Sequence, residues 1–416
     1  MTVQERLAAL RSLMKEKHVD AYLVPTDDFH GSEYVGDYFK CRKYITGFTG
    51  SAGTAVITSD MAGLWTDGRY FIQAAQQLEG TTVTLFKMGE PEVPTIHEFL
   101  KDKLTEGMCL GFDGRCVSAA ETEELKSLLA DKNIRFSVEE DLIGEIWKNR
   151  PELSSEPVME LEEKWAGKSR ADKCAQIREK MAEKGADAFI LTSLDDIAWL
   201  LNIRGNDIHC CPVVLSYLVM TQDEILLFAN EKAFDTAVRN SLEKDGVVLK
   251  PYNDIYQYVK TIPESRTVLL SRKNANSRLV SSLPDSVKIL DEENLTLLPK
   301  AIKNPVEVEN ERIAHIKDGV AVTKFIYWLK KNVGKTTITE LSAADHLFAL
   351  RKEQETSWTT ALILLFPMQA MRQSVTTARR RKQIFLWSLT DWHCAIQADI
   401  IWKVPPISQE RLSLAR

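Results

Sequence analysis

The residues best suited to chemistry in this chain form the heptad WTDGRYF at positions 65–71. Asp67-Gly68 favours a tight turn, which would present Arg69 at the start of a helix. A guanidinium held in that way suits bidentate recognition of a carboxylate or a carbonyl group, because its donors form a rigid planar fork. A structural ion pair fits the same spacing equally well, so the sequence leaves both roles for Arg69 open.

A second candidate is the glycine-rich stretch GFTGSAGT at residues 47–54, directly before a predicted strand. It lacks the G-K-[ST] ending of a phosphate-binding loop and the strand-first order of a dinucleotide fingerprint. Ser51 does not lie in a G-x-S-x-G context. The stretch therefore predicts close packing of the backbone and not a ligand site.

Residue types that bind metals are present, but their spacing does not form a ligand set. Five of the seven histidines are scattered, and none of these five falls in H-E-x-x-H or a comparable pattern: His30, His97, His209, His315 and His346. Cys210-Cys211 follows His209, yet adjacent cysteines rarely share one metal. Buried structural thiols are predicted there.

Size and composition set the class of protein. A chain of 416 residues is too long for one ordinary core and predicts two or three domains. Its net charge of −6 gives no footprint for nucleic acid or an anionic membrane. No apolar stretch reaches membrane-spanning length, and the N-terminus lacks the apolar core of a signal peptide. Seven scattered cysteines without a C-x-x-C pair indicate reduced thiols, so a cytoplasmic location is predicted.

The elements that must position these residues show an internal repeat between residues 5–28 and 172–195. Six residues match: Arg11, Met14, Glu16, Lys17, Asp20 and Ala21 face Arg178, Met181, Glu183, Lys184, Asp187 and Ala188. Each copy predicts a helix followed by a short strand, with further strands at 54–58, 83–88, 213–221 and 225–229. The repeat predicts two duplicated α/β domains, at 1–155 and 165–303. The polar stretch RPELSSEP at 150–157 joins them.

A third segment begins after the break at Lys303-Asn304-Pro305. Residues 306–333 predict one long amphipathic helix, with apolar positions at Val308, Ile313, Ile316, Val320, Val322 and Phe325. Residues 340–351 predict another helix, and the pattern then stops. From Ser357 to Arg416 there is no Gly, no Asn and no Tyr, and eight Lys or Arg against three Asp or Glu give a charge of +5. This change of composition marks 356–416 as an aberrant tail.

Three stretches together carry a resemblance to a known family: SEYVGDYFKCRKYITGFTGSAGTAVIT, GLWTDGRYFIQAAQQL and IAWLLNIRGNDIHCCPVVLSY. They are similar to the three-domain Xaa-Pro aminopeptidases (aminopeptidase P), and the likeness covers residues 1 to about 355. The resemblance implies an α/β chain with two creatinase-like N-terminal domains, followed at 305–355 by the opening helices of an incomplete pita-bread catalytic domain. It implies removal of a residue that precedes proline, by two divalent metals (usually manganese) with a bridging hydroxide. Arg69 is the only site residue that it carries over, as a peptide-contacting residue.

Two family motifs, the second of which carries the two Asp ligands in that family, are missing after residue 355, but both emerge when the tail is back-translated in another frame. Pairing the third base of each codon with the first two of the next forces Asp at 358–359, Ala at 368–369 and Glu at 402–403. Residues 358–377 are compatible with DDSFDTIIPYAGNAAISHY, and residues 395–411 with DSGGHYMEGTTDITRT. The tail is therefore predicted to be frame-shifted catalytic-domain sequence. The basic run at 379–382 and the pair His393-Cys394 are then coding accidents.

Three functional hypotheses follow. The resemblance implies a cytoplasmic Xaa-Pro aminopeptidase by ancestry, but without the family's Asp, Asp, His, Glu and Glu ligands the chain is predicted to be inactive, with no catalytic residue and no metal bound. The first alternative is a non-catalytic module that binds peptides with proline at the second position through Arg69, or that forms a homodimer. The second is a gene remnant, or a product of a sequencing error, with no function of its own. Neither nucleic acid nor membrane is expected as a partner.

Overall fold

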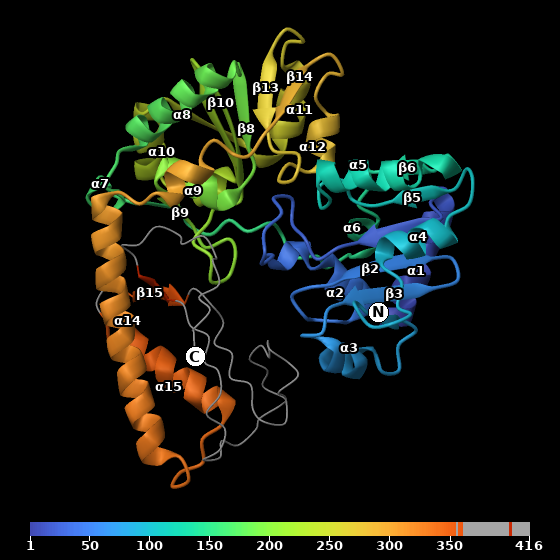
Figure 1. Cartoon of the computed structure of the whole chain (residues 1–416), viewed down its shortest axis with the longest axis horizontal. Helices are drawn as coiled ribbons and strands as arrows, with labels where there is room; N and C mark the ends of the chain where they lie inside the picture. The colour runs from blue at the N-terminus through green and yellow to red at the C-terminus, as the bar shows by residue number, and fades with distance from the viewer. Residues whose placement is uncertain (355–356, 361–398, 402–416) are drawn as a thin grey trace.

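The computed structural model describes residues 1–354, 357–360 and 399–401. It consists of two α/β domains and a pair of long helices that extends from the second domain (Figure 1). Most of the predicted frame-shifted tail, including the basic run at 379–382 and His393-Cys394, lies outside the described residues. Within that tail the structure describes only strands β15 (Ser357–Thr360) and β16 (Asp399–Ile401), which pair antiparallel.

The first domain is built on a six-stranded mixed sheet of order β4-β3-β2-β1-β5-β6. Its strands are β1 (Ala21–Val24), β2 (Thr54–Thr58), β3 (Ala62–Thr66), β4 (Thr84–Lys87), β5 (Cys109–Gly111) and β6 (Arg135–Ser137). Its helices are α1 (Val3–Glu16), α2 (Cys41–Thr46), α3 (Phe71–Leu78), α4 (Ile96–Lys103), α5 (Ala119–Leu128) and α6 (Leu142–Ile146). Strand β1 pairs antiparallel with β2 and parallel with β5, so it is an interior strand.

The second domain has a sheet of order β12-β11-β10-β8-β13-β14 and a small ladder of β7 with β9. Its strands are β7 (Met159–Glu160), β8 (Ala188–Leu191), β9 (Ile203–Arg204), β10 (Ser216–Thr221), β11 (Ile225–Ala229), β12 (Val247–Pro251), β13 (Thr267–Leu270) and β14 (Lys288–Asp291). Its helices are α7 (Glu163–Ala166), α8 (Arg170–Lys184), α9 (Leu194–Leu201), α10 (Thr236–Lys244), α11 (Ile255–Tyr258), α12 (Ser277–Ser281) and α13 (Leu297–Ala301).

The two sheets are equivalent strand by strand, which confirms the duplication predicted from the repeat. Strand β8 takes the place of β1, and β13 takes the place of β5. The helices before the two central strands bury matching positions at a constant offset: Leu7, Leu10 and Met14 of α1 correspond to Cys174, Ile177 and Met181 of α8. This spacing of three and four residues is the apolar stripe that an amphipathic helix lays on a sheet.

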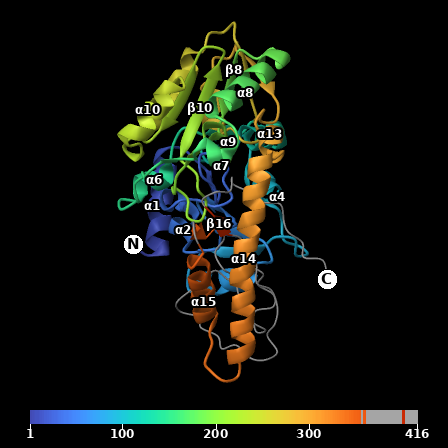
Figure 2. The same cartoon turned by 90° about the vertical axis from the view of Figure 1, so that its left-hand side faces the viewer.

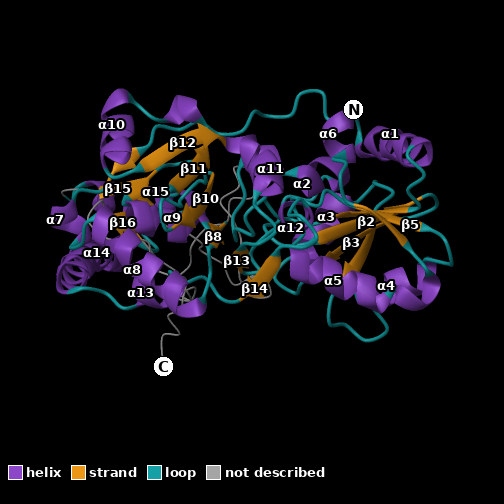
Figure 3. Ribbon diagram, turned by 90° about the horizontal axis from the view of Figure 1, so that it is seen from above, coloured by secondary structure: helices purple, strands orange, loops and turns teal. Residues whose placement is uncertain are grey.

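The two domains pack through the ends of equivalent helices. Ser118 caps α5, Asn276 caps α12, and the two residues form an antiparallel bridge between the domains. The backbone N–H of Ala119 donates to the carbonyl of Ala275 at 2.9 Å and extends the bridge. Figures 1 and 3 both place α5 beside α12. The contact is thus symmetric in kind, because each domain contributes the same part of the same fold.

The long helix α14 (Pro305–Asn332) runs beside the helix that follows it, α15 (Glu340–Lys352), as Figure 2 shows. Both bounds lie within one residue of the prediction. Ala321, Phe325 and Leu329 of α14 are buried in a cluster with α15. The predicted apolar face is only partly correct, because Phe325 is buried whereas Ile313, Ile316 and Val320 are exposed, Ile316 by 68%. The described residues that pack on α14 lie on its α15 side and at its start, so they leave that stripe uncovered.

The first turn of α14 is fixed to the second domain. Asn304 caps the helix and forms a capping box with Glu307. The Nδ2 group of Asn304 also donates to the carbonyl of Ala166 at 2.8 Å. Further along the helix, the Nδ2 group of Asn310 donates to the carbonyl of Trp165 at 3.0 Å. These contacts make the start of α14 part of the second domain.

Lys173 of α8 is a buried cation close to this anchor. Its Nζ donates to the carbonyl of Trp199 at 2.9 Å and to Oδ1 of Asn202 at 2.7 Å. Burial lowers its pKa to about 7, and the charge of Glu307 opposes this with a smaller effect. At physiological pH the Lys173 amine of the folded chain is therefore protonated in some molecules and neutral in others.

We expect the Lys173 amine to add to the free energy of unfolding as the pH rises from about 7 to 10.5, and the Lys173→Met variant to lose this contribution. In this window the unfolded chain keeps the Lys173 proton while the folded chain has released it, so higher pH favours folding. One such group contributes at most about 1.4 kcal/mol per pH unit. Urea unfolding at pH 7 and pH 9 measures the slope. Lys184→Met, at the exposed end of the same helix, is the control and should keep it; equal slopes in all three proteins would contradict the assignment.

Among the described residues, no helix is both long enough and apolar enough to cross a membrane.

Candidate functional site

The turn between β3 and α3 has the geometry that its sequence predicts. Strand β3 ends at Thr66, whose hydroxyl donates to the carbonyl of Ala52 at 2.8 Å. The backbone N–H of Tyr70 donates to the carbonyl of Asp67 at 3.0 Å and closes the turn. Helix α3 begins at the next residue, with Tyr70 as its N-cap residue. Arg69 therefore lies in the turn directly before the helix.

Arg69 forms a bidentate ion pair with Asp67. Its Nε and Nη2 atoms each lie 2.8 Å from one carboxylate oxygen, and its backbone N–H donates to the same carboxylate at 3.0 Å. The hydrogen bonds from Arg69 hold the pKa of Asp67 below its usual range. Both side chains remain exposed, by 45% and 37%. The structural ion pair is therefore real, and the guanidinium is also presented at the surface.

The glycine-rich stretch forms the wall beside this turn. The hydroxyl groups of Ser51 and Tyr70 are 2.6 Å apart. A Cβ atom on Gly50 would lie 2.7 Å from Cδ1 of Tyr70, closer than van der Waals contact allows. The close backbone packing predicted for this stretch is confirmed.

A second Asp-Gly-Arg sequence follows strand β5 and repeats the local geometry of the first. Arg115 places Nε 2.9 Å and Nη2 2.8 Å from the two carboxylate oxygens of Asp113, and its backbone N–H donates to Asp113 at 3.0 Å. These side chains are only 16% and 10% exposed. The same three residues thus serve once as a surface pair, at Asp67 and Arg69, and once as a buried pair.

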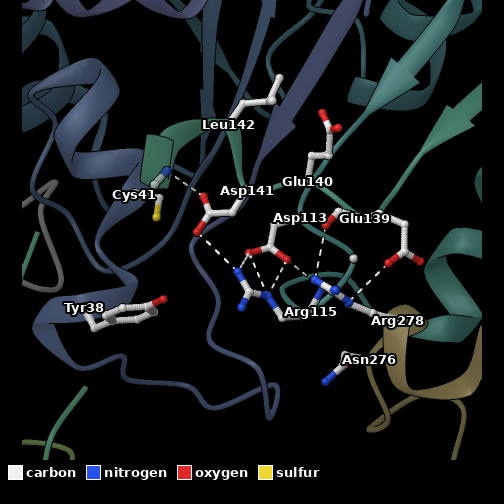
Figure 4. Close-up of polar contacts among 12 residues, drawn as sticks. Tyr38, Cys41, Asp113, Arg115, Glu139, Glu140, Asp141, Leu142, Asn276 and Arg278 are labelled. Carbon is white, nitrogen blue, oxygen red and sulfur yellow. Dashed lines mark hydrogen bonds and ion pairs between the residues drawn. The ribbon is translucent and has the colours of Figure 1, made fainter. Parts of the chain in front are cut away.

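The buried pair belongs to an ionic network that the sequence analysis missed (Figure 4). Nη2 of Arg115 lies 3.3 Å from Oδ2 of Asp141, and Nη1 of Arg150 pairs with the same oxygen. The other Asp141 oxygen accepts from the backbone of Gly144 at 2.7 Å and caps α6. The second occurrence of D-G-R was the available signal, whereas nothing local connects Asp141 with Arg115.

His30 has a structural role between the domains. Its Nδ1 lies 2.9 Å from the carbonyl of Thr192, and its Nε2 lies 2.6 Å from the hydroxyl of Tyr252. Burial lowers its pKa, so the ring is neutral at physiological pH. At the predicted pair of buried thiols, Cys210 is buried but Cys211 is only half-buried, and burial raises the pKa of Cys211 to about 11.

Across the described residues, no group of three or more His, Cys, Asp or Glu side chains is arranged to hold a metal ion. A two-metal centre therefore does not fit this part of the chain, and none of its residues can be given the role of a metal ligand.

Comparison with known proteins places this architecture. The model described as Creatinase/Prolidase N-terminal domain matches twice, at residues 6–142 and 149–307. The chain is 40% identical over 361 residues to "Probable Xaa-Pro aminopeptidase P" of Laccaria bicolor, an alignment that covers 84% of this chain and 55% of that protein. The chain belongs to the Xaa-Pro aminopeptidase P family. "Aminopeptidase P2" of Arabidopsis thaliana is 34% identical over 390 residues, covering 85% of this chain and 55% of that protein.

A solved structure from this family has the same fold. The X-prolyl aminopeptidase of Caenorhabditis elegans, described as a cytosolic enzyme with a di-nuclear active site, aligns with a TM-score of 0.82 at 32% identity. The alignment covers 88% of this chain and 62% of that one. The chain thus spans little more than half the length of these aminopeptidase P relatives.

Proposed function

We propose that this chain retains the peptide-recognition part of an Xaa-Pro aminopeptidase and lacks its hydrolytic part. One observation carries the proposal: the described residues hold both N-terminal domains of the family but no group of three metal-ligating side chains. On this proposal the domain boundaries fall at 155, 165 and 303. On the same proposal the helices of residues 305–355 are the opening helices of a pita-bread domain.

The proposed ligand is a peptide with proline at the second position, bound in the cytoplasm. Two divalent metals, manganese by resemblance, belong to the full-length relatives on this proposal and not to this chain.

The proposal extends to the tail, taken as frame-shifted coding sequence from about residue 356. Nucleotide sequencing around codon 356 tests that part, because a single-base correction must open a frame that encodes the missing ligand motifs. A homodimer is also proposed. Sedimentation velocity tests it, and a monomer in solution would contradict it.

Arg69 is the proposed peptide contact. Its exposed position and its fixed orientation support this role, because Asp67 and the turn hold the guanidinium before any ligand arrives. Two donors of the Arg69 guanidinium are already directed at Asp67. The group is therefore better suited to donate to a peptide carbonyl than to form a bidentate pair with a second carboxylate.

We expect Arg69→Ala to weaken binding of the tripeptide Ala-Pro-Ala by about 10- to 100-fold, the effect of losing a hydrogen bond from a charged donor. Calorimetric titration of the full chain measures it. Arg135→Ala, which removes an exposed arginine elsewhere in the first domain, is the control and should bind as the native chain does. Saturable binding that survives Arg69→Ala would remove Arg69 from the site. No saturable binding by the native chain would favour the gene-remnant hypothesis.

A further inference from the structure

Arg42 of α2 is a buried cation whose role the ion pairs do not explain. Its side chain is 3% exposed, and no carboxylate of the described residues forms a hydrogen bond or ion pair with it. Its guanidinium donates instead to Oγ1 of Thr26 at 2.8 Å, to the carbonyl of Phe48 at 2.7 Å and to the carbonyl of Gly50. Burial lowers its pKa to about 10, as expected for a charge without a counter-ion.

A core-filling role alone does not account for this residue. Burying a cation without a partner is unfavourable, and a methionine of similar length would fill the same space without that cost. The guanidinium does what methionine cannot, because it binds two carbonyls of the glycine-rich stretch at once. It also packs over the Phe48 ring at 4.6 Å. Arg42 therefore determines the path of the backbone from Phe48 to Gly50.

The glycine-rich stretch contacts the residues around Arg69, the proposed peptide contact, at three points. Ser51 contacts the hydroxyl of Tyr70 at 2.6 Å, and Ala52 accepts from Thr66 at 2.8 Å. The third contact joins the backbone N–H of Thr49 to Oε1 of Gln77 in α3, at 2.9 Å. The three contacts fix the end of β3, the residue after Arg69 and the helix that follows. A shift of residues 48–52 would move the turn that carries Arg69.

We propose that Arg42 is a positioning residue for peptide recognition. By holding the carbonyls of Phe48 and Gly50, it sets the glycine-rich stretch against Tyr70 and so fixes the Arg69 guanidinium at the surface. The inference rests on the proposed function, since Arg69 must bind the peptide for its position to matter. It adds a role in peptide recognition to the close backbone packing of the glycine-rich stretch.

The test compares Arg42→Met with Arg204→Met in the full chain. Arg204 is buried in the second domain, also donates to carbonyls (Ala198 and Ile203, both at 2.8 Å), and burial lowers its pKa to about 10 as well. Both variants should lose thermal stability. Only Arg42→Met should weaken Ala-Pro-Ala binding, by about tenfold or more, when titrated well below its unfolding temperature. Arg42→Lys, which can still reach one carbonyl, should recover part of the affinity.

Gly50→Ala provides a second, independent way to displace the same backbone and should weaken binding without touching Arg42. It also keeps the test informative if Arg42→Met does not fold. Native affinity in folded Arg42→Met, or equal loss of affinity in Arg204→Met, overturns the inference while the proposed function stands. Native affinity in Gly50→Ala counts against it in the same way. Failure of the native chain to bind overturns the proposed function itself, whereas an Arg69→Ala variant that binds as the native chain does removes Arg69 from the site and this inference with it.

Discussion

Incubated with Mn²⁺ and an Xaa-Pro dipeptide, the purified chain is expected to release no N-terminal residue above the metal-free background. Two-metal hydrolysis requires ligands that hold both metal ions. The ions in turn lower the pKa of the bridging water and stabilise the attacking and leaving oxygens. The described residues supply no such group. Because enzymes accelerate hydrolysis by at least about a million-fold, losing the centre should remove all measurable turnover. Chromatography of the released amino acid measures it.

The control for this experiment is the X-prolyl aminopeptidase of Caenorhabditis elegans, whose active site is described as di-nuclear. It should cleave the peptide under the same conditions. Release of amino acid by this chain that depends on Mn²⁺, disappears with chelator and copurifies with the protein would contradict the inactive assignment. Peptide binding without hydrolysis would separate the recognition module from both the active enzyme and the remnant.

Much of the fold could be predicted because its signals are local. The strands at 54–58 and 225–229 match β2 and β11 residue for residue. The start of α14 follows from Asn304 and Pro305, which cap the helix and occupy its first position. The repeat predicted two domains of one topology, since matching apolar spacing before matching strands permits little else.

Long-range partners could not be predicted in the same way. The face of α14 that carries Ile313 and Ile316 is apolar in sequence but exposed among the described residues, because burial depends on what packs against a helix and not on the helix alone. The candidate site shows the same limit. The D-G-R turn at Arg69 was visible in the sequence, whereas the contact of Arg42 with Phe48 and Gly50 needs the folded loop.

The two Asp-Gly-Arg turns allow burial to be separated from local geometry. We expect Asp113→Ala to destabilise the chain by about 3 kcal/mol, within the range for breaking a buried ion pair, and Asp67→Ala to cost less than about 1 kcal/mol. The hydrogen-bond distances in the two turns are nearly equal. The difference arises because the buried Arg115 would keep Asp141, 3.3 Å away, as its one ion-pair partner among the described residues, whereas water can reach the exposed Arg69.

Urea unfolding of the two variants, followed by tryptophan fluorescence, measures both losses. The ring of Phe29 lies 4.3 Å from the Arg115 guanidinium and packs with residues of the second domain, so Asp113→Ala should also loosen the contact between the domains. Equal losses in the two variants would mean that the hydrogen-bond pattern, and not burial, sets the strength of these pairs. A larger loss at Asp113 would show that burial, and not the shared hydrogen-bond pattern, sets the strength of these pairs.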